Sequence, residues 1–193
     1  MLKDKVATFK KVSRERFIED VLPYIKSVYR YDDEKSRYLA GDLYEKIKIP
    51  ARSTKESAGY DFFAYDNITL KKGIGLVIPT GIRCRIDSGY SLDLYPRSGQ
   101  GFKKKIRIAN TVGIIDSDYY RSSNEGHIMV KLVYEGFDDE SDKYTTHIEA
   151  GKAFCQGILH EVFGATNDDE DSMAIRDGGF GSTSKWYNYI LYF

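Results

Sequence analysis

The sequence predicts an all-β barrel or sandwich that follows a short helical segment. Many short stretches alternate apolar and polar residues, and breaks rich in Gly, Pro and Asn separate them at short intervals. Apolar residues recur at helical spacing in the first part of the chain. We therefore divide the chain into a helical N-terminal extension (1–44), a β domain (45–175) and a C-terminal arm (176–193).

Composition excludes several classes of partner. The 29 Lys and Arg residues balance the 29 Asp and Glu residues, so no overall field attracts nucleic acid or an anionic membrane. The sequence has no apolar run of about 18 residues and no apolar core of a signal peptide. We expect a cytoplasmic protein that binds neither membrane nor nucleic acid. Cys84 and Cys155 lie in apolar stretches and are expected to be buried, reduced thiols.

The N-terminal extension is expected to hold two helices. Ser13 is a suitable N-cap for the first, and Pro23 should kink it or break it into two. A second short helix is expected at 38–44, after the polar stretch 32–37. We expect a packing or partner-binding role here. The apolar residues at helical spacing are Phe17, Val21, Leu22, Ile25, Val28 and Tyr29.

Strands are expected from residue 45 onward, and between them lie loops. Two acidic patches, at 138–142 and 168–171, lack the alternating ligands and the glycine of a calcium loop, which favours solvated loops. The three histidines have no zinc-ligand spacing. The expected strands are "EKIKI" (45–49), "GLVIPTGIRCRI" (75–86), "GYSLDLYP" (89–96), "GHIMVKLVY" (126–134) and "KAFCQGILHEVF" (152–163).

The stretch "NTVGIIDSDYY" (110–120) ends an apolar strand with two aspartates. Asp is depleted in strands, and Asp116 and Asp118 would repel each other on one face of a strand. Two interpretations remain open from these residues alone. The strand ends in a solvated turn, or a rigid strand end holds a carboxylate for chemistry.

Three further stretches have polar groups beside glycines. In "SAGYDFFA" (57–64), Gly59 allows close backbone approach ahead of Asp61. In "YPRSGQG" (95–101), the proline places Arg97 and Ser98 on a turn, where both could face a ligand. In "RDGGFGSTSK" (176–185), the residues suit either a phosphate cradle or a flexible tail, and the spacing of a Walker A loop is absent.

Taken in chain order, five stretches resemble the five motifs of the trimeric dUTPase (dUTP pyrophosphatase) family. They are "AGYDFFA", "PRSGQG", "NTVGIIDSDYY", "GKAFCQGI" and "RDGGFGSTS", and the resemblance covers Lys46 to about Lys185. It implies a jelly-roll-like β-barrel and a homotrimer with active sites shared between subunits. It also implies hydrolysis of dUTP to dUMP and pyrophosphate with Mg²⁺, which lowers dUTP and supplies dUMP for thymidylate synthesis.

The resemblance also implies roles for residues of the third motif. Asp116 would orient and deprotonate the water that attacks the α-phosphorus. The ring of Tyr119 would lie under the deoxyribose and leave no space for a 2′-hydroxyl. Asn110 and Gly113 would contact the uracil edge from a hairpin. Asp118 is expected to be structural or to support the residues that contact the substrate.

The other motifs would bind the triphosphate and the metal. Asp61 would contact Mg²⁺ through water, and Arg176 would act as an arginine finger. Phe180 would stack on uracil. The remaining residues expected at the substrate are Arg97, Ser98, Gly99, Gln156, Gly181, Ser182 and Thr183.

Four features depart from the usual pattern of the family. Only "DGG" separates Arg176 from Phe180, one residue fewer than in many members. "RSSNE" (121–125) follows the third motif, so that Gly126 would make the turn that usually comes at once. The fourth motif, "GKAFCQG", has no arginine, and both ends of the chain are extended.

Three alternatives belong to other classes. The sister enzyme dCTP deaminase would need a glutamate at the base, and "PRSG" with "IDSDY" argues against it. A phage-type dUTPase that also binds a regulatory protein partner is a second alternative. A nucleic-acid-binding β-barrel would depend on the single basic run at 103–105, which suits a solvated loop better.

Overall fold

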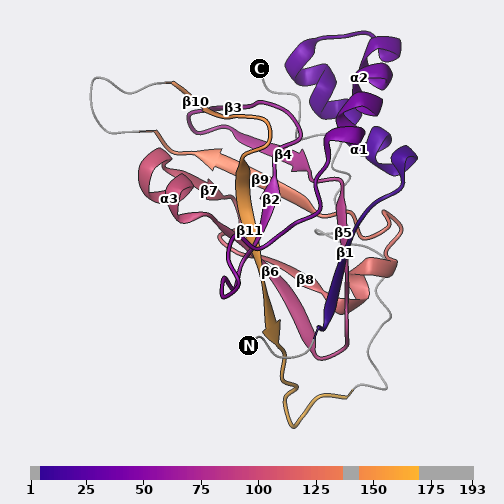
Figure 1. Ribbon diagram of the computed structural model, residues 1–193, viewed down its shortest axis with the longest axis vertical. Helices are drawn as coiled ribbons and strands as arrows, with labels where there is room; N and C mark the ends of the chain where they lie inside the picture. Colours follow the sequence, from indigo (N-terminus) through magenta and orange to yellow (C-terminus); the bar gives the residue numbers. More distant parts are fainter. Residues whose placement is uncertain (1–4, 137–143, 170–193) are drawn as a thin grey trace.

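The computed structural model describes residues 5–136 and 144–169 (Figure 1). The acidic patch at 138–142 and the C-terminal arm at 176–193 lie outside the described residues. The helices are α1 (Arg14–Tyr29), α2 (Asp33–Lys46), α3 (Ser98–Lys104) and the 3₁₀ helix η1 (Ser117–Arg121). The strands are β1 (Ala7–Lys11), β2 (Tyr60–Phe63), β3 (Ile68–Lys71), β4 (Gly75–Pro79), β5 (Ile82–Ile86), β6 (Tyr90–Pro96), β7 (Ile106–Ile108), β8 (Gly113–Asp116), β9 (Met129–Tyr134), β10 (Thr145–Ile148) and β11 (Ala153–Glu161).

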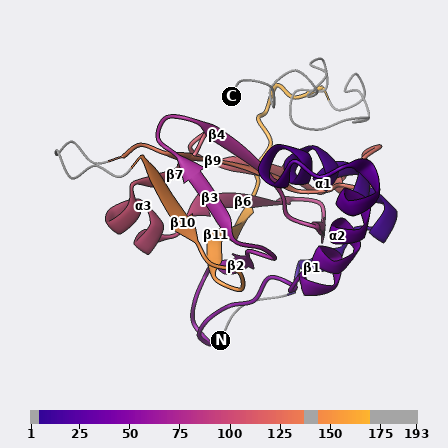
Figure 2. The same cartoon turned by 90° about the horizontal axis from the view of Figure 1, so that it is seen from above.

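The strands form two larger sheets and two two-stranded ribbons. The larger sheets have the orders β2-β11-β6-β8 and β4-β9-β7, and the ribbons are β1-β5 and β10-β3. Strand pairing within each is antiparallel. The strand-rich architecture agrees with the predicted all-β class, although the pairings among the described residues close no barrel. Helices α1 and α2 lie at the opposite end of the molecule from α3 in both views (Figures 1 and 2).

The N-terminal segment supplies a strand that the sequence analysis missed. Strand β1 pairs with β5 in continuous register, from Ala7 opposite Ile86 to Lys11 opposite Ile82. Its five residues alternate between half-buried and exposed positions, too short a pattern to distinguish from noise. The segment is therefore joined to the β domain by backbone hydrogen bonds as well as by helix packing.

Helix α1 begins where the sequence predicts but does not break. The Ser13 hydroxyl accepts a hydrogen bond from the backbone N–H of Arg16 at 3.1 Å, which confirms the N-cap. The helix continues through Pro23 to Tyr29, so the predicted alternative of a break into two helices is wrong, whereas the alternative of a kink stays a prediction. A proline removes one backbone hydrogen bond, and burial of the apolar face outweighs that loss. The buried residues are Phe17, Val21, Tyr24 and Ile25.

Helix α2 begins earlier than predicted. The Asp32 carboxylate accepts from the N–H of Lys35 at 2.9 Å, and two acidic residues follow in the first turn, where the helix dipole favours them. The polar stretch 32–37 is thus the start of a helix. The strand predicted at 45–49 is wrong, because Glu45 and Lys46 end α2 and the next residues form no strand. The strands predicted at 75–86, 89–96, 126–134 and 152–163 are all found as β4 and β5, β6, β9 and β11.

Helix α1 and the sheets share one hydrophobic core. The side chain of Phe17 is fully buried, and its ring packs 5.8 Å from that of Tyr44 and 5.2 Å from that of Tyr65. Both cysteines are free and buried, as predicted, and burial raises the pKa of the Cys84 thiol to about 12. No helix among the described residues is long and apolar enough to span a membrane.

Truncation of Phe17 should show that the N-terminal segment belongs to this core. Phe17→Ala should lower the free energy of unfolding by about 3–5 kcal/mol, because it leaves a cavity under α1. The matched control is Phe102→Ala, whose side chain is 90% exposed and whose effect should stay within about 0.5 kcal/mol. Denaturant unfolding measures both, and equal effects would contradict the shared core.

Candidate active site

Strand β11 sets residues of the first and fourth motifs side by side. Gln156 lies opposite Asp61 of β2 on one edge of β11 and opposite Tyr95 of β6 on the other. Side chains directly opposite each other in antiparallel strands point to the same face of a sheet. Asp61, Gln156 and Tyr95 therefore form a row across that face.

The second motif joins this row through side-chain contacts. Arg97 Nε lies 2.9 Å from Asp61 Oδ1, and the two side chains are 40% and 11% exposed. The Gln156 carboxamide donates a hydrogen bond to the carbonyl oxygen of Pro96 at 3.3 Å. Arg97 is the residue before α3, and Ser98 is the first of that helix, so the predicted turn is a strand-to-helix junction. One half-exposed guanidinium, one carboxylate and one carboxamide thus meet at the end of β6.

The two glycines near these residues, Gly59 and Gly99, have different surroundings. A Cβ on Gly59 would overlap Oε1 of Gln156, which confirms the predicted close approach. A Cβ on Gly99 would meet nothing within 4 Å, and Ser98 and Gly99 are both exposed. Packing within this chain therefore gives no reason for Gly99, which leaves room there for a ligand or a neighbouring chain.

The turn expected to form a hairpin connects two different sheets instead. Strand β7 pairs with β9 and β8 pairs with β6, so the residues between them link the two larger sheets. Thr111 has a positive φ of 65°, and the N–H of Val112 donates to the carbonyl of Asn110 at 2.7 Å. Asn110 is exposed at this turn, whereas Gly113 is buried against Leu94.

Asp116 is the last residue of β8, in accord with the interpretation of a carboxylate on a rigid strand end. It lies opposite Ser91 at the start of β6, whereas Arg97 follows the far end of that strand. Six residues of strand separate those two positions, about 20 Å at the usual rise per residue. A single chain therefore does not bring Asp116 to Arg97.

Tyr119 is packed inside the chain. Its side chain is only 2% exposed, and its hydroxyl donates to the carbonyl of His127 at 2.8 Å and accepts from Asn124 Nδ2 at 2.7 Å. The predicted contact of its ring with a sugar stays a prediction. The neighbouring Tyr120 is half-buried, and the guanidinium of Arg83 lies 3.7 Å from its ring centroid.

The sequence analysis missed other polar residues on the same sheet face. Ser91 donates to Asp93 at 2.9 Å, and the hydroxyl of Tyr95 lies 3.4 Å from Nε2 of His160. The alternation in "YSLDLYP" was a usable signal, because Leu92 and Leu94 face the core and the residues between them face outward. This polar face leads from the row at Gln156 toward Asp116.

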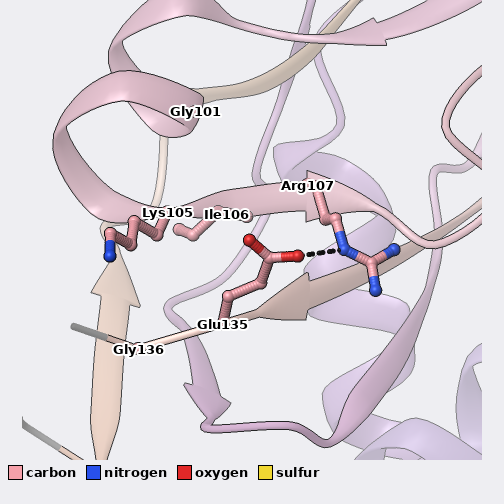
Figure 3. A pocket seen from close by; sticks show the side chains of 6 residues that line it. All are labelled: Gly101, Lys105, Ile106, Arg107, Glu135 and Gly136. Carbon is pink, nitrogen blue, oxygen red and sulfur yellow. Dashed lines mark hydrogen bonds and ion pairs between the residues drawn. The ribbon is translucent and has the colours of Figure 1, made fainter. Parts of the chain in front are cut away.

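A separate hollow of about 310 Å³ lies between α3, the start of β7 and the end of β9 (Figure 3). Two of its three charged side chains, Arg107 and Glu135, pair with each other at 2.5 Å. The described residues that line the hollow include none of those predicted for the site. They are Gly101, Lys105, Ile106, Arg107, Glu135 and Gly136.

The predicted metal would need its ligands mainly from elsewhere. No group of three or more His, Cys, Asp and Glu side chains among residues 5–136 and 144–169 could hold a metal ion. Asp61 offers a single carboxylate, already paired with Arg97. This donor set fits Mg²⁺ bound chiefly by phosphate oxygens and water, with Asp61 in contact through water. The predicted residues Arg176, Phe180, Gly181, Ser182 and Thr183 lie outside the described residues.

Comparison with known proteins identifies the family. The model of the dUTPase family matches residues 45–184. The deoxyuridine 5′-triphosphate nucleotidohydrolase of Lactococcus lactis is 38% identical over 138 residues, which cover 71% of this chain and 88% of that protein. The enzyme of the same name from Nautilia profundicola is 33% identical over 146 residues, 74% of this chain and 95% of that one. The chain belongs to the dUTPase family.

Solved structures confirm the jelly-roll-like fold of that family. The dUTPase of Streptococcus mutans superposes with a TM-score of 0.57 at 26% identity, over 82% of this chain and 98% of that one. The dUTPase of phage phi11 of S. aureus gives 0.53 at 22% identity, over 67% and 92%, and supports the fold alone. The family match begins at residue 45, so β1, α1 and most of α2 lie outside it.

Thiol reactivity should confirm that the sheet face opposite the row of Asp61, Gln156 and Tyr95 is closed to solvent. Cys155 precedes Gln156 and is fully buried, and burial together with the charge of Asp61 raises the pKa of its thiol. In the native protein at about pH 8, neither Cys155 nor Cys84 should react with an aromatic disulfide reagent, and both should react after unfolding. Rapid reaction of one thiol in the native protein would show that the back of the sheet is open.

Proposed function

We propose that this protein is a dUTP diphosphatase that hydrolyses dUTP to dUMP and pyrophosphate. The observation that carries the proposal is the meeting of Arg97, Asp61 and Gln156 at the end of β6, in a chain of the dUTPase family. Curated relatives that share a third or more of their residues with this chain are named deoxyuridine 5′-triphosphate nucleotidohydrolases. The reaction would lower the concentration of dUTP, and its product dUMP would be available for thymidylate synthesis.

The triphosphate would bind at the start of α3. A guanidinium pairs with phosphate oxygens through two parallel hydrogen bonds. The Arg97 side chain is 40% exposed, so a phosphate could reach it. The hydroxyl of Ser98 and the carboxamide of Gln156 add neutral hydrogen bonds, and bare Gly99 admits the ligand. Asp61 would hold Arg97 in place and accept a hydrogen bond from metal-bound water. Mg²⁺, bound with the triphosphate, would neutralise charge on the phosphate oxygens.

Asp116 is proposed as the general base. Its carboxylate would take a proton from a water molecule while the water oxygen bonds to the α-phosphorus. The bond from the α-phosphorus to the oxygen that bridges to the β-phosphorus then breaks, and pyrophosphate leaves with that oxygen. Such chemistry depends chiefly on positioning and charge neutralisation, which suits a carboxylate held at a strand end.

The separation of Asp116 from Arg97 supports a shared site. If both act on one triphosphate, they must come from different chains, because about 20 Å of strand separates them within one. A cyclic homotrimer, as the family resemblance implies, brings different patches of identical chains together three times. Ile114, on the same sheet face as Asp116 and 61% exposed, is an apolar residue that such a contact would cover.

Base and sugar recognition would complete the site. We propose that Asn110 and Gly113 contact the uracil edge and that Tyr119 selects against a 2′-hydroxyl. In the C-terminal arm, Arg176 would neutralise charge on the phosphates, Phe180 would stack on uracil, and Gly181, Ser182 and Thr183 would reach the γ-phosphate. A regulatory protein partner stays a prediction.

The test of the proposed function compares two products. The purified protein with Mg²⁺ should release pyrophosphate from dUTP and no ammonia from dCTP. Ammonia from dCTP would instead indicate the deaminase reaction. Absence of both products would overturn an enzymatic function.

Replacement of Asp116 should separate catalysis from binding. Asp116→Asn is nearly isosteric and should keep nucleotide affinity, while kcat for dUTP should fall about a hundredfold or more. Asp118→Asn, two residues further along the chain, is the matched control and should keep most of the activity. A normal kcat in Asp116→Asn, measured by pyrophosphate release, would remove this residue as the base.

Mixing two inactive variants should restore activity. Asp116→Asn and Arg97→Ala should each be nearly inactive, and chains unfolded and refolded together should form mixed trimers. In an even mixture, roughly a quarter of the sites would draw both groups from unsubstituted segments. Activity near that fraction supports a site shared between chains. If both residues served one site from the same chain, mixing would restore nothing.

A further inference from the structure

The insertion that follows the third motif is fastened to helix α1. Residues 122–127, which include the rest of the insertion (121–125) and the two residues after it, lead from η1 toward β9, and two of them bond to the N-terminal segment over more than a hundred positions of sequence. These are Glu125, which bonds to Ser13, and His127, which bonds to Asp20. The insertion departs from the usual family pattern, and α1 lies outside the family match, so two features particular to this chain meet here.

Glu125 completes the cap of α1 from a distance. Its carboxylate accepts the backbone N–H of Ser13 at 2.8 Å and the Ser13 hydroxyl at 2.7 Å. In a capping box, a Glu or Gln three residues into the helix accepts the N–H of the N-cap residue, but that position here is Arg16. Glu125 accepts the N–H of the N-cap residue in its place. Burial alone would raise the pKa of Glu125, but the hydrogen bonds from Ser13 and the charge of Arg83 outweigh it and hold the pKa below its ordinary value.

His127 is held in one tautomer between α1 and the β domain. The side chain is fully buried, and its Nε2 accepts the backbone N–H of Gly81 at 2.8 Å. Because Nε2 must keep its lone pair for that bond, Nδ1 has the proton and donates it to Asp20 Oδ2 at 2.6 Å. Burial lowers the pKa of His127 and thereby favours this neutral form.

The same segment, together with Arg83 of β5, contacts the two tyrosines of the third motif. The carbonyl of His127 accepts the hydroxyl of Tyr119, and the guanidinium of Arg83 donates to the carbonyl of Tyr120 at 2.7 Å. Arg83 also lies 3.8 Å from Glu125. A Cβ on Gly126 would collide with the backbone of residues 119 and 120, so the insertion folds tightly against η1. A continuous set of directional contacts therefore runs from α1 to the residues just after Asp116.

We propose that Asp20, Glu125 and His127 are positioning residues for the reaction, through which the N-terminal segment fixes the third motif. The inference rests on the proposed dUTP hydrolysis and adds residues that act on Asp116 through η1. Apolar contacts would suffice if α1 only covered the core, and an ionised carboxylate beside a buried imidazole is costly unless each polar atom is bonded. Hydrogen bonds with fixed donors and acceptors specify one orientation, which a catalytic carboxylate needs.

The test measures catalysis per competent site in the full-length protein. The variants are Asp20→Ala, which leaves Nδ1–H of His127 without its acceptor, and Glu125→Ala, which removes the distant cap at a side chain that is 33% exposed. Asp20→Asn is the conservative variant, because its amide oxygen can still accept from Nδ1. Asp33→Ala is the control, an exposed carboxylate of α2 that pairs with Lys26. A non-hydrolysable dUTP analogue, titrated to saturation, counts the binding-competent sites of each protein.

A positioning role predicts a lower kcat per competent site with a nearly unchanged KM. The fall should be about tenfold to a hundredfold in Asp20→Ala, the size that small misplacements of reacting groups produce. Asp20→Asn should recover most of the loss, Glu125→Ala should fall in the same direction, and Asp33→Ala should match the unsubstituted protein. A merely structural role would lower the number of competent sites and leave kcat per site normal in both alanine variants, which would overturn the inference. Lack of dUTP turnover by the unsubstituted protein would instead overturn the proposed function itself.

Discussion

The register of β11 is the constraint on which the candidate site depends. This strand pairs with β2 on one edge and with β6 on the other, and Gln156 is the residue where the two pairings place Asp61 and Tyr95 on one face. A slip by one residue would turn Gln156 into the core and bring Gly157 or Cys155 to the site. The core prevents that slip, because Gly157 faces Leu92 and Phe62, where a Cβ would already collide. Burial of one face of the sheet therefore determines which polar side chains lie on the opposite face.

The sequence predicts those parts of the fold that have long, regular patterns. Strands β6, β9 and β11 have six or more residues and lie in predicted stretches, and β4 and β5 share one predicted stretch of 12 residues, whereas β1, an isolated strand of five residues, was missed. The predicted break at Pro23 failed because propensity is local and the packing of Phe17 and Ile25 is not. Within the site, the family resemblance implied separate roles for Arg97 and Asp61, and their contact with each other was not predicted. No sequence pattern could pair Asp20 with His127, which are 107 positions apart.

The single chain holds the two parts of the proposed catalytic arrangement at opposite ends of one strand. Arg97 follows the end of β6, near the other residues proposed to bind phosphate, and Asp116 lies beside the first residues of that strand. Assembly of identical chains is the economical way to join such halves, because one rotation serves every site. The same reasoning gives the N-terminal segment a purpose. If Asp116 acts on a neighbouring chain's substrate, as we propose, its carboxylate must be held rigidly, and the bonds of α1 to Glu125 and His127 would contribute to that support.

The most direct test of this account is the crystal structure of the assembled protein with Mg²⁺ and a non-hydrolysable dUTP analogue. The account predicts that each triphosphate contacts Arg97, Ser98 and Gln156 of one chain. It also predicts that a water molecule lies beside the α-phosphorus. The oxygen of that water should lie about 2.6–3.2 Å from a carboxylate oxygen of Asp116 from another chain. Contacts of one nucleotide with Asp116 and Arg97 of the same chain would contradict the account. A nucleotide bound away from the Asp61–Gln156 row would contradict it as well.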